Sequence, residues 1–253
     1  MTKKTVLITG ATSGIGEACA RRFCEGGYNL IITGRNEEKL SSLKDELIKN
    51  GARVLTMCFD VRDTDKVKEL LTTLPEDFKN VDVLINNAGL AVGLDPEYAV
   101  SYEDAFTMVD TNVKALFAVT RAIVPGMIER NRGHVINVGS VAGDAAYAGG
   151  SVYCATKAAV KALTDGLRID LAKTCVRVTN LKPGLVETNF SVVRFKGDKS
   201  KADNVYKGIK PLTGDDIADV AFYAASAPEH VQIAEVLILA THQATGSVVY
   251  RES

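Results

Sequence analysis

A tyrosine and a lysine four residues apart form the sharpest chemical pattern in this chain. Tyr153 and Lys157 stand in the string YCATK, within a stretch of helical periodicity, and positions i and i+4 share one face of a helix. An ammonium group near a phenol favours the phenolate, so we expect Lys157 to lower the pKa of Tyr153 from about 10 toward neutral pH. Such a tyrosine can exchange a proton with an alcohol or a carbonyl group.

The residues around Tyr153 and Lys157 favour a catalytic pair over a pair of solvated side chains on a helix. Tyr-x-x-x-Lys also occurs by chance as a solvated helix pair. Here it follows a nucleotide-type half domain, and the preceding strand-like run, His134–Val138, leads into Gly139 and Ser140. A hydroxyl there can donate a hydrogen bond to a substrate oxygen, so we predict that Ser140 acts together with Tyr153.

A glycine-rich loop, TGATSGIG at 9–16, lies between the first predicted strand and a helix. Its glycines let the backbone turn tightly and approach a pyrophosphate, and the helix N-terminus supplies free N–H groups and the positive end of a dipole. The alternative is a strand–helix loop that binds no ligand. The residues of this loop that we assign to a cofactor site are Gly10, Thr12, Ser13, Gly14, Ile15 and Gly16.

The end of the second predicted strand indicates which dinucleotide would bind. In an NAD site an acidic residue at this point bonds the ribose 2′-hydroxyl, but the sequence here is ITGRN, with no carboxylate. Arg35 offers a charge-assisted fork for a 2′-phosphate. The alternative is that Arg35 simply lies at a helix start, where the macrodipole disfavours a cation. The pattern favours NADP.

Two further loops complete the predicted cofactor site. The string NNAG at 86–89 follows the fourth predicted strand, and its small residues suit either a passing dinucleotide or a tight turn. Asp60, after the third strand, either accepts a hydrogen bond from the adenine amino group or is an exposed loop aspartate. From these loops we assign Asp60, Val61, Asn87, Ala88 and Gly89 to the cofactor.

These residues stand on an alternation of strands and helices that predicts one doubly wound α/β domain over residues 1–253. The predicted strands are apolar and β-branched, as expected for a parallel sheet buried on both faces: Thr5–Thr9, Asn29–Thr33, Arg53–Cys58, Val81–Ile85, His134–Val138, Arg177–Leu181 and Glu235–Leu239. Helices are predicted over 17–25, 37–49 with Asn36 as N-cap, 65–74, 101–129, 151–173 and 215–224 with Thr213 as N-cap.

The stretch from Lys182 to Pro211 interrupts this alternation, because it holds no clear strand or long helix. A connection of this length in a compact domain is usually functional or disordered, and it follows the carboxyl end of a strand, where open α/β sheets bind ligands. We predict a substrate lid over 184–211; the alternative is an insertion without function.

Composition excludes several classes of protein. Thirty basic and 31 acidic residues give a formal charge of −1, which offers no footprint for nucleic acid or an anionic membrane. No run approaches the roughly 20 apolar residues of a membrane span. Five cysteines without a Cys-x-x-Cys pair favour reduced thiols and a cytoplasmic location. Three scattered histidines predict no metal site.

Taken in order, these motifs resemble the short-chain dehydrogenase/reductase family. TGATSGIG, NNAG, Asn112, Ser140, Tyr153 and Lys157 follow the family's order, and the likeness covers essentially the whole chain. The resemblance implies a Rossmann sheet of seven parallel strands with helices on both faces. It implies that Tyr153 transfers the proton, Ser140 polarises the substrate oxygen, Lys157 holds the nicotinamide ribose and depresses the Tyr153 pKa, and Asn112 supports a relay water.

Further matches implied by the family concern the nicotinamide and the substrate. The segment expected beside the nicotinamide contributes Pro183, Gly184, Val186 and Thr188. Strings such as TGRNEEKL (33–40) and YAGGSVYCATKA (147–158) are similar to the NADP-dependent 3-hydroxy acid dehydrogenases, a group that includes serine and allo-threonine dehydrogenases and malonic semialdehyde reductases. Members are typically homotetramers.

A 3-hydroxy acid needs a partner for its carboxylate. Arg194 and Lys196 are the cations available in the predicted lid; the alternative is that both are solvated surface charges. Tyr147 is expected to line the same pocket. The resulting prediction is an NADP-dependent dehydrogenase of short 3-hydroxy acids. The alternatives are a carbonyl reductase for 3-oxoacyl, sugar or diketone substrates, and an NADP(H) sensor without catalysis.

Overall fold

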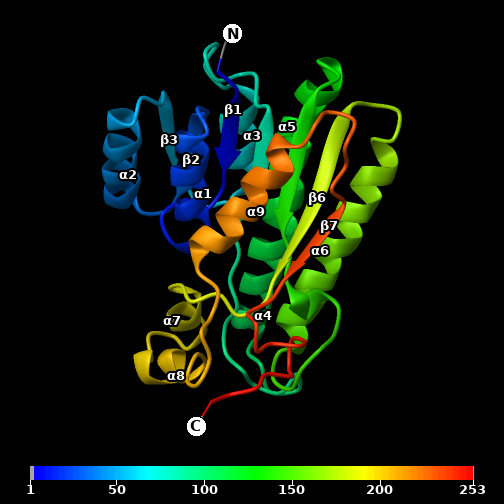
Figure 1. Ribbon diagram of the computed structural model, residues 1–253. Coiled ribbons are helices and arrows are strands. Elements are labelled where there is room, and N and C mark those ends of the chain that lie inside the picture. The colour runs from blue at the N-terminus through cyan, green and yellow to red at the C-terminus, as the bar shows by residue number, and fades with distance from the viewer. Residues whose placement is uncertain (1–2, 253) are drawn as a thin grey trace.

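The computed structural model of the chain describes residues 3–252 and contains one seven-stranded sheet in the order β3-β2-β1-β4-β5-β6-β7 (Figure 1). Every pair of neighbouring strands is parallel. The strands are β1 (Thr5–Ile8), β2 (Asn29–Gly34), β3 (Val54–Cys58), β4 (Val83–Asn86), β5 (Gly133–Val138), β6 (Val176–Pro183) and β7 (Glu235–Ile238). All seven predicted strands are confirmed, with bounds that differ by a few residues.

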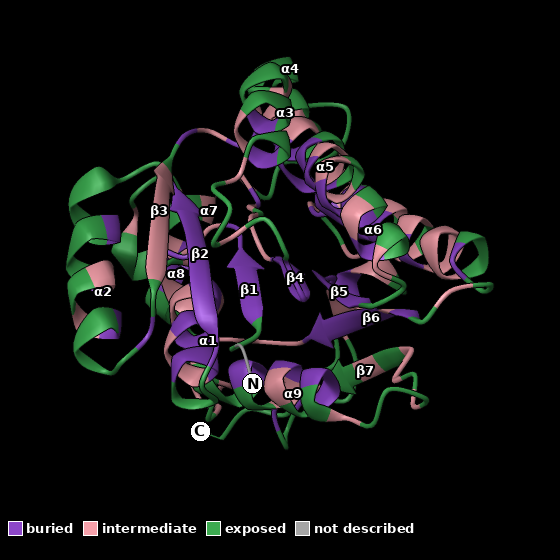
Figure 2. Cartoon of the chain, turned by 90° about the horizontal axis from the view of Figure 1, so that it is seen from above, coloured by how far each residue is buried: buried purple, intermediate pink, exposed green. Residues whose placement is uncertain are grey.

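Helices cover both faces of the sheet, as the view along the strands shows (Figure 2). One face carries α1 (Gly14–Glu25), α2 (Glu37–Lys49) and α9 (Gly214–Ser226). The other carries α3 (Thr64–Thr72), α5 (Ala115–Glu129) and α6 (Ser151–Asp170). The remaining helices, α4 (Tyr102–Val109), α7 (Phe190–Arg194) and α8 (Lys199–Asn204), lie at the end of the molecule where the strands point (Figure 1).

Alternating strand residues fill two separate cores. In β1, Val6 and Ile8 pack under α1 and α9, whereas Leu7 packs under α3 and α5. All three side chains are fully buried. This two-sided burial explains why the strands read as continuous apolar runs in the sequence. Because all neighbouring strands are parallel, their carboxyl ends lie at one edge of the sheet.

The helix starts predicted from capping residues are confirmed. The Asn36 side chain accepts a hydrogen bond from the Lys39 amide, and Thr213 forms a capping box with Asp216 at the start of α9. Each cap satisfies backbone N–H groups that the first helical turn leaves unpaired. The first helix begins at Gly14 rather than Glu17, so part of the glycine loop belongs to its first turn.

The single helix predicted over 101–129 is interrupted by a π-helical turn, η1 (Asp110–Lys114), which joins α4 to α5. The predicted lid region contains the two short helices α7 and α8. Within residues 3–252, no helix is long and apolar enough to cross a bilayer.

Candidate active site

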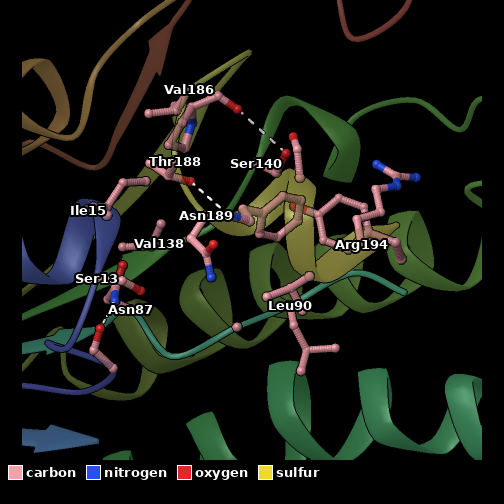
Figure 3. Close-up of a pocket in the computed structure, with 18 of the residues that line it drawn as sticks. Ser13, Ile15, Asn87, Leu90, Val138, Ser140, Val186, Thr188, Asn189 and Arg194 are labelled. Atoms are coloured by element: carbon pink, nitrogen blue, oxygen red, sulfur yellow. Dashed lines mark hydrogen bonds between the residues drawn. The ribbon is translucent and has the colours of Figure 1, made fainter. Parts of the chain in front are cut away.

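A cavity of about 670 Å³ opens at the carboxyl ends of the strands, where the strand order reverses between β1 and β4. Such a switch point is where doubly wound folds bind ligands. The glycine loop, the loop after β4 and the segment after β6 line it together. In Figure 3, Ser13, Ile15 and Asn87 lie toward one side of this cavity, and Ser140 and Arg194 toward the other.

The glycine loop forms one wall as predicted, with one exception. Gly10 and Gly14 have φ of +68° and +57°, a conformation that side chains disfavour. Ser13, the N-cap of α1, makes no side-chain hydrogen bond to its helix, so its hydroxyl is free for a ligand. Gly16 is buried and does not line the cavity; a Cβ there would lie 2.3 Å from the Gly10 carbonyl oxygen. Gly16 therefore permits helix–strand packing rather than ligand contact.

A cluster of charged groups lies at the far end of this wall. Arg35 lines the cavity with its side chain 63% exposed, and its Nη1 is 3.8 Å from the Asp60 carboxylate. Asp60 also holds Arg62 in a bidentate pair, and the hydrogen bonds from Arg62 keep the pKa of Asp60 below its usual value. Lys39, in the first turn of α2, lines the cavity too. Lys39 was not predicted, although it lies only four residues after Arg35.

Tyr153 lies at the opposite end, with 8% of its surface exposed. Burial raises the pKa of its phenol above the ordinary value, while a hydrogen bond with Ser140 and the charge of Arg194 act to lower it. The expected net lowering by Lys157 is not found: the Lys157 ammonium is 5.9 Å from the Tyr153 ring centroid. At that distance its effect is smaller than the desolvation of the phenolate.

Ser140 and Lys157 are each held by a hydrogen bond with a backbone group. The Ser140 hydroxyl accepts a hydrogen bond from the Ala142 amide at 3.1 Å. Lys157 Nζ donates to the Val138 carbonyl at 2.8 Å, and burial lowers the pKa of Lys157 to about 8. Both Ser140 and Lys157 line the cavity, so the structure brings together the triad that the sequence predicted.

Asn112 does not line the cavity but fixes the loop that does. It is 1% exposed within the π-helical turn. Its amide nitrogen donates to the Leu90 carbonyl at 2.8 Å and to Thr156 Oγ1 at 3.0 Å, and its oxygen accepts from the Leu90 amide. Thr156 in turn donates to the Tyr153 carbonyl. Asn112 therefore ties the loop after β4 to the helix that carries Tyr153.

Arg194, the last residue of α7, reaches into the cavity beside Tyr153. Its guanidinium carbon lies 5.4 Å from the Tyr147 ring centroid and 5.7 Å from that of Tyr153. Nε donates to the Gly93 carbonyl at 3.2 Å, whereas Nη2 is buried without a hydrogen-bond partner. The Gly93 amide donates to the Arg194 carbonyl at 2.8 Å. A buried cationic donor without a partner is costly, and an anionic ligand would satisfy it.

Lys196 was predicted beside Arg194, and the structure contradicts this. The Lys196 side chain is 63% exposed, lies outside the cavity and forms an ion pair with Asp104 at 2.8 Å. Lys196 follows the end of α7 with φ of +52°, so the backbone has turned and its side chain leaves the direction of Arg194. Only the arginine of the predicted pair faces the site.

The segment after β6, over which a lid was predicted, contributes to the lining of the cavity. Pro183, Gly184, Val186 and Thr188 all line the cavity. Tyr206, beyond α8, donates from its hydroxyl to the Val186 carbonyl at 2.9 Å and is 2.6 Å from Ser191 Oγ. These bonds tie both short helices of the segment to the strand end.

The C-terminal residues hold both ends of this segment. Gln243 accepts a hydrogen bond from the Leu185 amide at 2.8 Å. Arg251 donates to the carbonyls of Lys207 and Val205, and the Glu252 amide donates to the Gly208 carbonyl. No sequence motif marks these long-range contacts, because their partners are backbone amide and carbonyl groups, which nearly every residue possesses.

The remaining predicted residues fall into place around the cavity. Those that line it are Thr12, Ile15, Val61, Asn87, Ala88, Gly89 and Tyr147. Lining residues that the sequence analysis missed include Leu90, Leu94, Asn189, Phe190 and Gln243. The Phe190 ring packs edge-on against Tyr153 at 5.7 Å. Leu90, Leu94 and Phe190 are apolar and therefore carry no chemical signal in the sequence.

The residues present fit a dinucleotide that carries a 2′-phosphate. The free N–H groups of α1 and the unbonded Ser13 hydroxyl suit a pyrophosphate. Arg35 and Lys39 at the start of α2 suit a second phosphate. Among residues 3–252, no group of three or more histidine, cysteine or acidic side chains could hold a metal ion.

Comparisons with known proteins agree with this geometry. The family "short chain dehydrogenase" matches residues 4–199. The NADP-dependent 3-hydroxy acid dehydrogenase YdfG of Salmonella typhi is 51% identical over 97% of this chain and 99% of its own. Sulfoacetaldehyde reductase 2 of Chromohalobacter salexigens is 47% identical over 94% and 95%. A solved closed form of serine dehydrogenase with NADP+ superposes with a TM-score of 0.92 at 46% identity, covering 98% of this chain and 100% of that one.

Proposed function

Because the chain belongs to the short-chain dehydrogenase family, we propose that it is an oxidoreductase that transfers a hydride between NADP(H) and short 3-hydroxy acids or the matching aldehydes and ketones. The relatives named for NADP and for 3-hydroxy acids support this activity. The observation that carries the substrate class is the unpartnered Arg194 guanidinium nitrogen beside Tyr153.

Tyr153 is the proposed proton carrier. With its pKa raised by burial, the phenol is protonated at neutral pH and is ready to donate to a carbonyl oxygen in the reductive direction. In the oxidative direction it must first lose that proton. The hydrogen bond with Ser140 and the charge of Arg194 both act to lower the pKa. Ser140 is proposed to hold the substrate oxygen beside the phenol.

Lys157 and Asn112 support this proton transfer. Lys157 lines the cavity, and its ammonium lies 5.9 Å from the centre of the Tyr153 ring. We propose that Lys157 holds the ribose next to the nicotinamide. Asn112 is proposed to keep the Leu90 loop and the Tyr153 helix in register through its three hydrogen bonds. Both hydrogens of the Asn112 side-chain amide are used in these bonds. A relay water beside Asn112 would therefore bind to the main chain of Asn112.

The cofactor is proposed to lie along the wall formed by the glycine loop. Bound NADP+ supplies the hydride acceptor. The N-terminus of α1 and Ser13 would hold the pyrophosphate, and Arg35 with Lys39 would hold the 2′-phosphate. Asp60 is proposed to orient Arg35 and Arg62 beside the adenine, since its carboxylate is already paired with both.

Arg194 is proposed to bind the acid group of the substrate, and Tyr147 to hold Arg194 in place. The guanidinium fork matches a carboxylate in two parallel hydrogen bonds, and the Tyr147 ring lies 5.4 Å from the Arg194 guanidinium carbon. The relative named for sulfoacetaldehyde extends the candidate acid groups to a sulfonate, which a guanidinium also binds.

A spectroscopic assay that follows the formation of NADPH or NADH tests the proposal. Purified protein is mixed with NADP+ or NAD+ and with 3-hydroxypropionate, 3-hydroxyisobutyrate, L-serine, L-allo-threonine, 2-hydroxyethanesulfonate or a neutral secondary alcohol. Reduction of NADP+ by the acids, and hardly by the alcohol, is the expected result. Turnover of the alcohol alone would instead indicate a carbonyl reductase with another substrate. NADPH binding without any turnover would indicate a sensor.

We also propose a homotetramer in the cytoplasm. The support is a set of exposed apolar side chains on the helices expected to form the interface: Tyr102 and Phe106 on α4, Phe117 and Ile128 on α5, and Ile169 on α6. Large exposed apolar groups of this kind mark association surfaces. Light scattering after gel filtration should give four times the 27.1 kDa chain mass, and cell fractionation tests the compartment.

A further inference from the structure

We infer that the substrate end of the cavity selects its substrates by net charge, and that it favours short hydroxy acids of charge −1 without an ammonium group over zwitterionic 2-amino-3-hydroxy acids. This inference rests on the proposed function and narrows its substrate class. It concerns the difference between 3-hydroxypropionate and L-serine, which differ only in an amino group.

The charges around Tyr153 carry the inference. Two cations line this end of the cavity, Arg194 and Lys157. Among the described residues that line the cavity, Asp60 is the only carboxylate, and it belongs to the opposite end, where it is paired with Arg62 and Arg35. The charged or ionisable groups that act on the Tyr153 phenol are Tyr147, Arg194 and Cys154, none of which is a carboxylate.

Acidic residues near this end of the cavity already have partners or lie on the surface. Asp144 is paired with Lys182 at 2.8 Å, and Asp104 is paired with Lys196 at 2.8 Å. Asp95 and Glu187 are exposed and do not line the cavity. An ammonium group on the substrate therefore has no carboxylate to replace the water that it loses on binding.

The amide group of Gln243 is already used: its Oε1 accepts a hydrogen bond from the Leu185 amide, and its nitrogen donates to the Thr245 carbonyl. A neutral acceptor elsewhere in the cavity would supply a hydrogen bond to the ammonium but no opposite charge. The acid group of a 2-amino acid lies next to its ammonium, so seating the acid on Arg194 brings two positive charges together. Desolvation and like-charge repulsion both disfavour that complex. A substrate of charge −1 meets neither cost and satisfies the buried Nη2 of Arg194.

The first test is how the preference for 3-hydroxypropionate over L-serine changes with pH. We compare kcat/KM for 3-hydroxypropionate and L-serine with NADP+ from neutral to alkaline pH. Both substrates meet the same free enzyme, so the ionisations of Tyr153 and Lys157 cancel in the ratio. We expect 3-hydroxypropionate to be favoured at least roughly tenfold at neutral pH. The ratio should then fall by up to about tenfold per pH unit as the serine amine loses its proton.

Several results would overturn the inference. A ratio that does not change with pH, or a preference for L-serine at neutral pH, removes charge selection while leaving the proposed dehydrogenase intact. Absence of turnover with every acid overturns the proposed function and this inference together. Dead-end ligands give a readout without turnover: calorimetry on the NADP+ complex should detect propionate and not L-alanine, and equal binding of the two would contradict the inference.

A carboxylate placed in the cavity provides the matched variant. Asn189 is an exposed lining residue that makes no capping hydrogen bond, so Asn189→Asp changes charge with little change in shape. It should shift the ratio toward L-serine by roughly tenfold at neutral pH. The control is Asn50→Asp, an exposed residue at the end of α2, which should leave the ratio unchanged. Equal ratios for the wild type and Asn189→Asp would count against the inference, with circular dichroism showing that the variant is folded.

Discussion

Lys182 offers a direct test of how β6, the strand that ends at the cavity, is held. It lies on β6 next to Pro183, with its side chain 7% exposed, and its ammonium pairs with Asp144 at 2.8 Å and with Glu235 at 2.5 Å. Asp144 lies at the end of the 3₁₀ turn that follows Ser140. Burial acts to lower the pKa of Lys182, but the hydrogen bonds to Asp144 and Glu235 raise it above the ordinary value. The ion pairs therefore outweigh desolvation.

The substitution Lys182→Met removes the cation and leaves two carboxylates facing each other. Breaking a fully buried ion pair costs about 3–5 kcal/mol. Asp144 and Glu235 keep 35% and 37% of their side-chain surface exposed, so water can solvate them in part. We expect a loss of about 2 kcal/mol in the free energy of unfolding, or roughly 4–8 °C in Tm for a domain of this size.

Urea denaturation at one protein concentration measures this loss. Lys201→Met is the control, because Lys201 forms an exposed pair with Asp198 at 3.4 Å and should cost less than about 0.5 kcal/mol. Adding Asp144→Asn and Glu235→Gln to Lys182→Met should restore most of the stability, since no unpaired charge remains. The folded-state pKa of Lys182 is raised, so its contribution is complete below the unfolded pKa and is lost only as pH rises through the folded value. If Lys182→Met costs no more than Lys201→Met, the reasoning is wrong.

Three further predictions concern the site. Tyr153→Phe should reduce turnover by at least roughly 100-fold while fluorescence titration shows NADPH affinity nearly unchanged; a large loss of affinity would contradict the assigned role. Arg35→Glu should reduce the preference for NADP+ over NAD+ by roughly 100-fold or more through repulsion of the 2′-phosphate, whereas Lys68→Glu, a remote exposed change, should not. Since burial raises the pKa of Tyr153, an ultraviolet titration of the free enzyme should show no phenolate from Tyr153 near neutral pH. If a phenolate signal appeared near neutral pH and were lost in Tyr153→Phe, the pKa of Tyr153 would be lowered rather than raised, and this prediction would be wrong.

Local sequence patterns predicted the scaffold well because the sheet is buried on both faces and the helices carry caps. Asn36 and Thr213 mark helix starts through side-chain chemistry that depends only on near neighbours. The π-helical turn around Asn112 was not predicted. It depends on hydrogen bonds to Leu90, 22 residues away, and no local pattern encodes such a partner.

The sequence predicted the parts of the site whose chemistry depends on residue type. It did not predict the parts that depend on which way a side chain points. Tyr153, Ser140 and Lys157 come together because each stands at a fixed place after a strand or on a helix face. Arg194 and Lys196 are two residues apart with the same charge, yet only Arg194 faces the cavity. Their separation depends on where α7 ends and on the backbone turn at Lys196, which a polar lid sequence does not specify.

The contacts of the C-terminal residues with the segment after β6 bear on how the protein should be produced. Arg251 and Glu252 bond to residues 205–208, which follow α8, whereas the first residues described lie at the opposite end of the molecule (Figure 1). A purification tag at the carboxyl terminus would be attached close to residues 205–208, of which Val205 and Tyr206 line the cavity. An affinity tag or a surface-coupling linker therefore belongs at the amino terminus, far from the residues that line the cavity.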